Sequence, residues 1–449
     1  MSEPGRDTRL ILSDVKVREL AALFGTPLYV LDEGHFRTRI RRYREAFRQA
    51  WPECEVTFAS KANSTLAVLA IAYEEGCLID AASEGELRAA IAAGVPTHRC
   101  HLHGNNKSFA ELEFAFEVGV GQIVVDHFVE IEQIFELQQT YHRCPDLVLR
   151  LAPGVDPVTH EKIATGQADT KFGFNIANGA ADRAVGVMLG LNLPLVGFHC
   201  HIGSQLLDSE AHYAAAEVVA EFAIGQWRRD RFMARVLNLG GGLGVRYLDT
   251  DEPPAVEDHC RRLVDGVVEG LGGFNLQPKL VQEPGRALIA ESGVTLYRIG
   301  AIKTVPIGDG KSRTYLAVDG GLSDNARPAL YDAKYSVRGI PADAREEGGE
   351  VPVFDDLAPV LDRFTVAGKH CETDTLFADV LLPHDLQVGD YLQVLCTGAY
   401  NSSMASNYNR FPRPATVLIL EDGTPELVQR RDTWDEMFAR EILPQRENR

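Results

Sequence analysis

Apolar runs of strand length alternate with amphipathic segments of helix length between residues 56 and 283. The predicted strands are Val56–Phe58, Leu78–Ala81, Cys100–Leu102, Gln122–Val125, Leu147–Leu151, Leu195–Phe198, Val236–Leu239 and Lys279–Gln282. Strand–helix units that repeat about every 28 residues force a parallel sheet with right-handed crossovers, and this spacing is typical of a (β/α)8 barrel. A doubly wound open sheet has the same element order and remains the alternative on the count alone.

Polar side chains directly follow most of these predicted strands. They include Lys61, His103, Asp126, His199 with His201, Gly240 to Gly242, and Glu283. A barrel places its active-site loops after all of its strands, whereas an open sheet concentrates them at one switch point. The fold class that the sequence favours is therefore α/β, a parallel TIM-type (β/α)8 barrel.

The pattern changes near residue 290. Runs rich in β-branched and aromatic residues, such as Val294–Val305 and Ala415–Leu420, are separated by turn residues, and helical periodicity is nearly absent. This texture predicts a mostly β C-terminal domain. We expect an N-terminal segment over 1–30 that packs with the β domain, a barrel over 31–290 and the β domain over 291–449. The acidic stretch Ala342 to Asp356 is predicted to be an exposed loop.

The net charge of −19 over 449 residues argues against binding to nucleic acid or to an anionic membrane surface. The first 14 residues lack the apolar core of a signal peptide, and no apolar run reaches the length of a transmembrane helix. The eight cysteines contain no Cys-x-x-Cys pair, so they predict neither a zinc site nor a disulfide framework. A soluble chain in a reduced, cytoplasmic compartment is expected.

Lys61 lies between the strand Val56–Phe58 and a helix predicted to start at Thr65, with Asn63 or Ser64 as its cap. A lysine in this position is ordinarily a solvated surface group. The alternative is an amine held at the mouth of a pocket to form a Schiff base with an aldehyde cofactor. This stretch alone does not decide between them.

The loops after the last three strands carry residues suited to such a cofactor. Gly240 to Gly242 let the backbone approach a phosphate, although a glycine run is also a common tight turn. Glu283 can protonate a pyridine nitrogen, or form a surface ion pair with Arg286. The pair His199 and His201 suggests a metal, but without a third ligand of suitable spacing a stacked cofactor ring fits better, and no metal is predicted.

In the predicted β domain, Cys371 stands among charged and polar residues and is expected to be accessible. A nearby base can depress the pKa of such a thiol, although a lone cysteine is more often inert and buried. The loop from Gly398 to Asn409 is rich in glycine and amides, and its composition indicates only a loop.

These motifs together resemble the alanine-racemase-like (fold type III) pyridoxal-phosphate decarboxylases. The resemblance runs in order from about Pro27 to about Ile419. The motifs that carry it are FASKAN, SEGEL, HGNNKS, TKFGF, GFHCHIGSQ, LNLGGGLG, EPGRA, NARPALY, CET and GAYNSSMASNYN. Within this family the best match is to members that decarboxylate meso-2,6-diaminopimelate to L-lysine and CO₂, the last step of lysine biosynthesis.

The resemblance implies a role for each matching position, with pyridoxal 5'-phosphate as cofactor. The implied catalytic residues are Lys61 as the Schiff-base lysine, His201 stacked on the ring, Glu283 at the ring nitrogen and Cys371 as proton donor. The implied cofactor contacts also include Ser204, Gly240, Gly241, Gly242, Pro284, Gly285, Arg286 and Tyr400. The implied substrate contacts are Arg286, Arg327, Tyr331, Glu372 and Tyr400.

The resemblance further implies an obligate homodimer in which Cys371 and Glu372 reach the barrel of the other subunit. One departure is Lys369-His370 before the cysteine, where the family usually has a proline; it puts the pH profile in doubt more than the reaction. A decarboxylase of ornithine, arginine, lysine or a carrier-bound amino acid is the alternative. A racemase and a non-catalytic regulatory relative are more remote ones.

Overall fold

The structure is a computed structural model that describes residues 9–155, 170–343, 360–372 and 374–444. The chain forms two compact units. The barrel unit comprises Gly34–Arg246 and Thr250–Ala290, and the β unit takes in the described residues of Met1–Glu33, Tyr247–Asp249 and Glu291–Arg449. Each unit is described by itself below.

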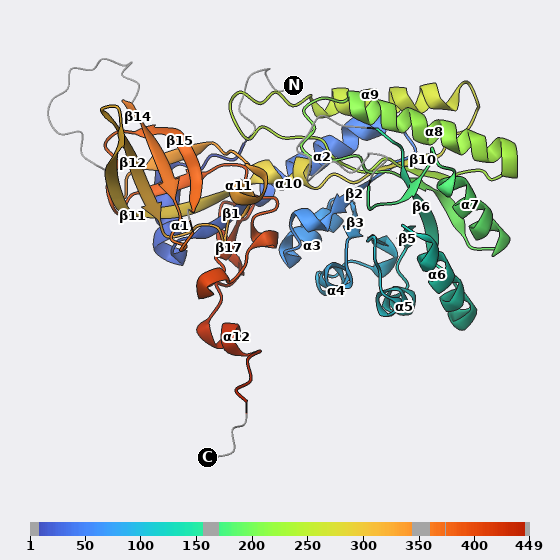
Figure 1. Ribbon diagram of the computed structural model, residues 1–449, viewed down its shortest axis with the longest axis horizontal. Coiled ribbons are helices and arrows are strands. Elements are labelled where there is room, and N and C mark those ends of the chain that lie inside the picture. Colours follow the sequence, from blue (N-terminus) through green and yellow to red (C-terminus); the bar gives the residue numbers. More distant parts are fainter. Residues whose placement is uncertain (1–8, 156–169, 344–359, 373, 445–449) are drawn as a thin grey trace. The chain divides into compact units, whose positions relative to one another are not determined.

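Eight parallel strands close into a barrel, which confirms the predicted fold class (Figure 1). They are β2 (Cys54–Ala59), β3 (Leu78–Ala81), β4 (Cys100–Leu102), β5 (Gln122–Val125), β6 (Asp146–Ala152), β8 (Leu195–His199), β9 (Val236–Asn238) and β10 (Lys279–Gln282). The β2–β10 and β5–β6 pairings close the ring, and the short β7 (Phe174–Asn175) pairs with β6. Because helices cover the barrel, its strands are apolar on both faces and almost wholly buried.

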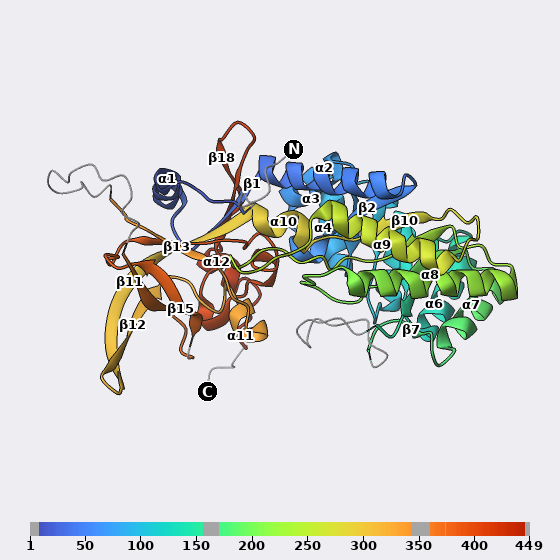
Figure 2. The ribbon, with the colours of Figure 1, turned by 90° about the horizontal axis from the view of Figure 1, so that it is seen from above.

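Helices follow the barrel strands in the expected alternation. They are α3 (Leu66–Glu74), α4 (Glu84–Ala92), α5 (Phe109–Val118), α6 (Phe128–Tyr141), α7 (Ala180–Gly190), α8 (Glu210–Asp230), α9 (Val256–Leu271) and α10 (Arg286–Ile289), and α2 (Glu33–Ala50) precedes β2. Figure 2 shows α8 and α9 side by side. Gly266 and Gly270 of α9 make this approach possible, because a Cβ at either would lie 2.3 or 2.2 Å from a carbonyl oxygen of α8.

The turn that carries Lys61 differs in detail from its prediction. Residues Ser60–Ala62 form a 3₁₀ turn, η1, directly after β2. The predicted cap is wrong, since α3 has Thr65 at its N-cap and no side-chain cap hydrogen bond. Asn63 instead uses Oδ1 to accept from the backbone N–H and the hydroxyl of Thr65. Such local side-chain bonding competes with helix capping.

The β unit contains a nine-stranded mixed sheet. Its strands are β1 (Leu28–Asp32), β11 (Gly293–Gly308), β12 (Lys311–Val318), β13 (Val337–Ile340), β14 (Leu361–Ala367), β15 (Thr375–Pro383), β16 (Tyr391–Val394), β17 (Ala415–Ile419) and β18 (Pro425–Gln429). Its helices are α1 (Asp14–Phe24), α11 (Arg327–Tyr331) and α12 (Trp434–Phe438). Strand β1 runs antiparallel to β11 and parallel to β17, and apolar residues of all three join one buried core. Residues 344–356 of the predicted loop lie outside the described residues.

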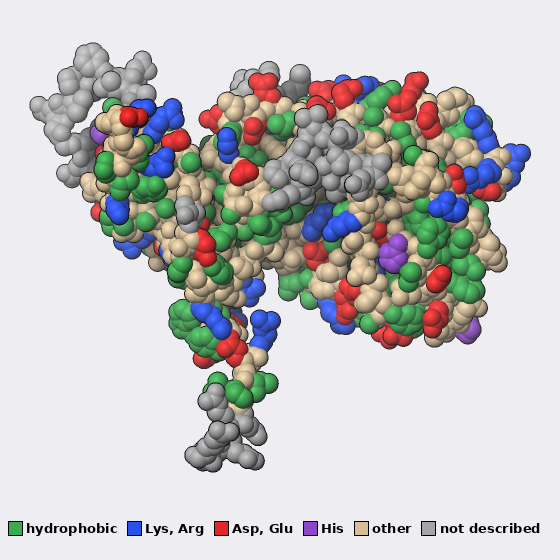
Figure 3. All heavy atoms as spheres, in the orientation of Figure 1, with side chains coloured by type: hydrophobic (Ala, Val, Ile, Leu, Met, Phe, Trp, Pro, Cys, Tyr) green, Lys and Arg blue, Asp and Glu red, His purple; other side chains and the backbone are tan. Residues whose placement is uncertain are grey.

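The surface carries both signs of charge. On the face drawn in Figure 3, acidic and basic side chains are interspersed. Within the described ranges, no helix has the length and apolar character needed to cross a membrane. All eight cysteines belong to the described part of the chain and are free thiols.

Candidate active site

The C-terminal ends of the barrel strands bring together residues that are far apart in the sequence. Lys61 follows β2, His103 follows β4, His199 ends β8, and Glu283 follows β10. Because all of these strands are parallel and their ring is closed, their C-terminal ends lie at one face of the barrel. The Lys61 side chain is exposed, whereas His103, His199 and Glu283 are buried.

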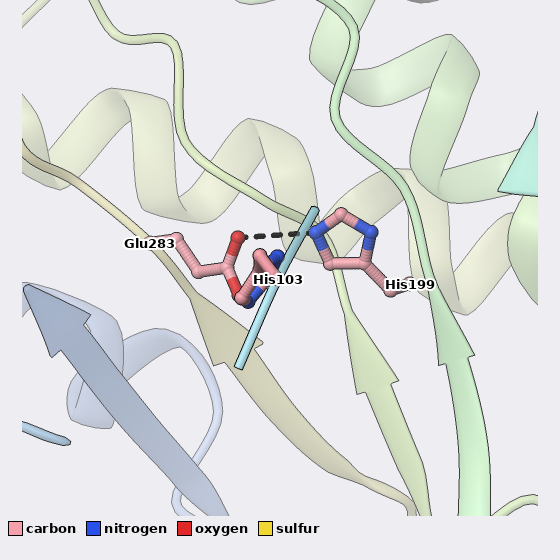
Figure 4. Close-up of side chains that lie close together, drawn as sticks. All are labelled: His103, His199 and Glu283. Carbon is pink, nitrogen blue, oxygen red and sulfur yellow. Dashed lines mark hydrogen bonds and ion pairs between the residues drawn. The ribbon is translucent and has the colours of Figure 1, made fainter. Parts of the chain in front are cut away.

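The Glu283 carboxylate is the centre of a buried polar cluster (Figure 4). His199 Nε2 lies 3.0 Å from Glu283 Oε2, and His103 Nε2 lies 3.1 Å from Glu283 Oε1. Asn238 Nδ2, at the end of β9, donates to Glu283 Oε1 over 2.6 Å. Asp80 of β3 places Oδ1 3.5 Å from His103 Nε2. Five strands or their following loops thus each supply one side chain to the cluster.

The charges in this cluster are mutually dependent. Burial alone would raise the pKa of Glu283, but the nearby positive charge at His103 and the hydrogen bond from His199 hold it well below its ordinary value. Burial alone would lower the pKa of His103, and the carboxylates of Asp80 and Glu283 raise it instead. Burial lowers the pKa of His199 to about 4, so this ring is a neutral donor near pH 7. Glu283 is therefore ionised.

His103, His199 and Glu283 also have the spacing of a possible metal centre. Their ligand-type atoms all lie within 4.8 Å of one another. His201, which formed the predicted His-x-His pair with His199, is not a member of this group. The expectation that the protein uses no metal stays a prediction.

His201 is held by the glycine loop. The backbone N–H of Gly241 donates to His201 Nδ1 over 3.2 Å, which leaves the ring proton on Nε2. Burial lowers the pKa of His201 well below its ordinary value, and the charges of Lys61 and Arg150 lower it further. The amine of Lys61 therefore acts on the electrostatics of this ring, and His201 is neutral.

The loop of Gly240 to Gly242 packs more closely than any larger residue allows. A Cβ at Gly240 would lie 2.4 Å from Cys200 O, one at Gly241 2.2 Å from Glu283 O, and one at Gly242 2.6 Å from Gly203 O. The N–H of Gly240 donates to Asn238 Oδ1, and that of Gly241 donates to His201. These two donors serve the packing of the loops, and a phosphate-binding role for the loop stays a prediction.

Ser204 and Arg286 meet beside this loop. Arg286 is buried at the start of α10, and its Nη2 and Nε donate to Ser204 Oγ over 3.0 and 3.3 Å. An exposed lysine amine, a neutral imidazole, a guanidinium paired with a hydroxyl and a buried carboxylate form the donor set that a phosphorylated pyridine aldehyde requires. The residues of this face therefore fit pyridoxal phosphate.

A second group of predicted residues lies in the β unit. The buried Arg327 donates from Nε to Tyr335 Oη over 2.8 Å. Its Cζ lies 5.5 Å from the ring centroid of Tyr331, 5.6 Å from that of Tyr400 and 5.8 Å from that of Tyr247. Among the described residues, no carboxylate forms an ion pair with this guanidinium. A buried cation without an anionic partner is unfavourable unless a ligand supplies one.

Cys371 and Glu372 are exposed in the β unit. The hydroxyl of Tyr408 donates to the Glu372 carboxylate, and this hydrogen bond lowers the pKa of Glu372. His370, the departure before Cys371, is buried and directs Nδ1 at Asp374 Oδ2 over 2.7 Å. The ring of His370 also stacks on Tyr408, so this histidine helps to hold the segment that carries Cys371 and Glu372.

Several residues of these groups escaped the sequence reasoning. Asp80 and Asn238 belong to the short strands β3 and β9 and are buried. A polar residue within an apolar run was the signal that could have marked them. Tyr247 and Tyr335 had no local signal, because their importance comes only from their proximity to Arg327. Asp126, the remaining polar residue predicted after a strand, lies 3.6 Å from Arg150 of β6.

Gly241→Ala is expected to destabilise the barrel unit by about 1–3 kcal/mol, because its Cβ overlaps the Glu283 carbonyl oxygen. The displaced Glu283 loop should also weaken cofactor binding. Urea unfolding and equilibrium dialysis of the cofactor measure the two effects. Gly186→Ala is the control, since a Cβ there meets nothing within 4 Å and helix α7 should gain about 0.5–1 kcal/mol. Equal changes in the free energy of unfolding and in cofactor affinity for the two variants would contradict the role of close packing at Gly241.

Comparison with known proteins identifies the family. The model of the family described as "Pyridoxal-dependent decarboxylase, pyridoxal binding domain" matches residues 34–290. The diaminopimelate decarboxylase of Bacillus subtilis (strain 168) is 42% identical over 447 residues, which cover 98% of this chain and 97% of that protein.

Solved structures give the same result. The diaminopimelate decarboxylase of M. jannaschii in complex with L-lysine has a TM-score of 0.84 and 31% identity, and the match covers 98% of this chain and 97% of that one. The Helicobacter pylori diaminopimelate decarboxylase complexed with L-lysine has a TM-score of 0.80 and 30% identity, with 94% and 98% covered. The chain belongs to the pyridoxal-dependent decarboxylases and, within them, to the diaminopimelate decarboxylase family.

Proposed function

We propose that this chain catalyses the decarboxylation of meso-2,6-diaminopimelate to L-lysine and CO₂ with pyridoxal 5'-phosphate. The family match supports the reaction class, and two of the solved relatives are complexes with L-lysine, the expected product. The observation that carries the choice of substrate is Arg327. Its buried guanidinium lacks a carboxylate partner among the described residues, and diaminopimelate brings a second carboxylate at the end remote from the reaction.

The proposed cofactor site is the C-terminal face of the barrel. Lys61 binds the cofactor covalently, His201 stacks on its ring, and Glu283 pairs with its ring nitrogen. The phosphate and neighbouring atoms are assigned to Ser204, Gly240, Gly241, Gly242, Pro284, Gly285, Arg286 and Tyr400. When bound, pyridoxal phosphate withdraws the electron pair that the departing CO₂ leaves behind. Burial of Glu283 keeps water away from its contact with the ring nitrogen.

The proposed residues for the far end of the substrate are Arg327, Tyr331 and Glu372, and Arg286 and Tyr400 are proposed as further substrate contacts. Arg327 donates to the distal carboxylate, and the exposed, ionised Glu372 accepts a charge-assisted hydrogen bond from the distal ammonium. Cys371 is proposed to deliver a proton from Sγ to the α-carbon once CO₂ has left. Its exposure supports this role, since a thiol that meets a substrate must be accessible.

We propose that the active protein is a homodimer with composite sites. Cys371 and Glu372 are exposed on the β unit, while Lys61 and Glu283 belong to the barrel unit. A homodimer in which each β unit serves the partner's barrel gives these exposed residues a function. We further propose a barrel domain over 31–290 and a β domain over 291–449, and a cytoplasmic location, which eight free thiols support.

A panel of substrates tests this function. Release of CO₂ should be fastest by far from meso-diaminopimelate, compared with ornithine, arginine and lysine, because these three lack a distal carboxylate. A clear preference for ornithine or arginine would establish the rival decarboxylase. Racemisation of an amino acid without CO₂ release would favour the racemase. Inactivity on all of these substrates would favour the regulatory relative.

Arg327→Leu is expected to raise KM for meso-diaminopimelate by roughly 10- to 100-fold, the effect of losing a charged hydrogen-bond partner. Arg327→Lys keeps the charge but loses the bidentate geometry of the guanidinium, so an intermediate KM is expected. Arg313→Leu is the matched control, because Arg313 lies exposed on β12. Initial-rate kinetics with thermal melting of each variant measure the effect. An unchanged KM in a folded Arg327→Leu enzyme is incompatible with the assignment.

A further inference from the structure

The carboxylate of Glu283 is bonded more extensively than a simple partner of a ring nitrogen requires. His199 approaches one oxygen, while His103 and Asn238 approach the other, over 2.6 to 3.1 Å. All of these side chains are buried. Figure 4 shows both imidazole rings beside the carboxylate. The two rings are 5.1 Å apart at 74°, an edge-to-face arrangement that fixes each against the other.

The two histidines make different contributions. His103 Nε2 lies 3.5 Å from Asp80 Oδ1 and 3.1 Å from Glu283 Oε1, and these two carboxylates raise its pKa against the effect of burial, so they favour the cationic ring that balances part of their negative charge. His199 is neutral and donates its Nε2 proton to Glu283. One histidine therefore supplies charge and the other supplies a hydrogen bond, and each makes the anionic form of Glu283 more stable.

The consequence concerns a proton shared between Glu283 and the ring nitrogen of the cofactor. Such a proton resides on the more basic of the two atoms. Every donor to the carboxylate lowers its basicity, so the proton stays on nitrogen, and a protonated ring withdraws electrons more strongly. Without these donors, a buried carboxylate tends to take the proton itself, because burial disfavours its charged form.

We propose that His103 and His199 are positioning residues that hold Glu283 as a fixed anion and thereby keep the cofactor's ring nitrogen protonated. The proposal rests on the proposed function, and it adds two residues that the assignment of Glu283 alone does not require. Asn238 holds the geometry of the same carboxylate, since its amide donates to Glu283 while its oxygen accepts from Gly240.

The test is the ¹⁵N chemical shift of the ring nitrogen in enzyme loaded with ¹⁵N-labelled pyridoxal phosphate, since this shift separates the protonated from the unprotonated ring. Wild-type enzyme should show a protonated nitrogen. His199→Phe removes a donor and should lower the ratio of protonated to unprotonated nitrogen roughly tenfold or more. His199→Gln retains an N–H donor and should restore most of the protonated form. His103→Gln removes the charge of the ion pair with Glu283, so its ratio should also fall.

His259→Gln is the matched control, because His259 is equally buried in the barrel unit but bonds Ser209. The ratio in this variant should equal that of the wild type. A protonated ring nitrogen in folded, cofactor-loaded His199→Phe and His103→Gln enzymes overturns the proposal. So does an equal fall in His259→Gln. Should His199→Phe fail to fold, the comparison of His199→Gln with His103→Gln decides. The proposal requires a lower ratio of protonated to unprotonated nitrogen in His103→Gln, and equal ratios in the two variants contradict it.

The wild-type measurement separates this proposal from the proposed function. If wild-type enzyme binds no cofactor, or releases no L-lysine from meso-diaminopimelate, the proposed function is wrong. If wild-type enzyme does both and the histidine variants keep a protonated ring, only the role of His103 and His199 is wrong.

Discussion

Lys61→Ala is expected to lower the turnover of meso-diaminopimelate by roughly 10³-fold or more, because Lys61 is the proposed covalent catalyst and no other group would replace it. The exposed amine stands at the C-terminal end of β2, and its charge affects the pKa values of the buried Asp80 and His201. Borohydride reduction followed by peptide mass spectrometry should find the cofactor on Lys61 in the wild type and on no residue in the variant.

Lys279→Ala is the matched control for this experiment. Lys279 is the first residue of β10, is exposed, and pairs with Glu55 at the opposite, N-terminal end of the barrel strands. This variant should keep both its turnover and the label on Lys61. Covalent label on another lysine, together with substantial turnover in Lys61→Ala, would show that the catalytic amine lies elsewhere.

The barrel was predictable because its signal repeats. Each of its eight strands is a short apolar run, and closure of the ring buries both faces of every one, so errors in single boundaries do not change the topology. The β unit was less predictable in detail. Strand β13 is four residues long with only Ile340 buried, and β18 is a largely exposed edge strand. Neither strand therefore shows a clear alternation of apolar and polar residues.

Candidate site residues could be named from the sequence only where a motif marked them. Lys61 and Glu283 stand in loops with recognisable neighbours. The partners of Glu283 come from different strands, and the distances that join them arise only when the ring closes. The aromatic surroundings of Arg327 are similar, since Tyr247 comes from a short segment that the chain contributes to the β unit between two parts of the barrel. Local pattern carries no information about such contacts.

The helix cap near Lys61 shows the reverse failure, in which a local signal was present and misleading. Asn63 is a favourable cap residue, yet its side chain bonds Thr65 two residues on, and the helix starts later. Both arrangements satisfy the same amide oxygen, so the choice depends on the path of the chain after η1 and not on residue type.

The last prediction concerns the proposed sharing of active sites between subunits. Lys61→Ala and Cys371→Ala homodimers should each be nearly inactive, because one lacks the proposed covalent catalyst and the other the proposed proton donor. If each site combines the barrel of one subunit with the β unit of the other, a heterodimer of the two variants has one intact site and one with both defects. Random pairing makes half of the dimers heterodimers, so mixing should restore about a quarter of the wild-type activity.

Purified heterodimers with a different affinity tag on each subunit make the experiment decisive. A heterodimer of the wild type with the double variant Lys61→Ala/Cys371→Ala is the matched control, because it contains the same four side chains in the opposite arrangement. Composite sites require that this control be inactive, since each of its sites lacks one group, while the heterodimer of single variants is active. Sites contained within one subunit require the reverse outcome. Composite sites and sites within one subunit are therefore distinguished by which of the two heterodimers is active, whatever the absolute activity of either.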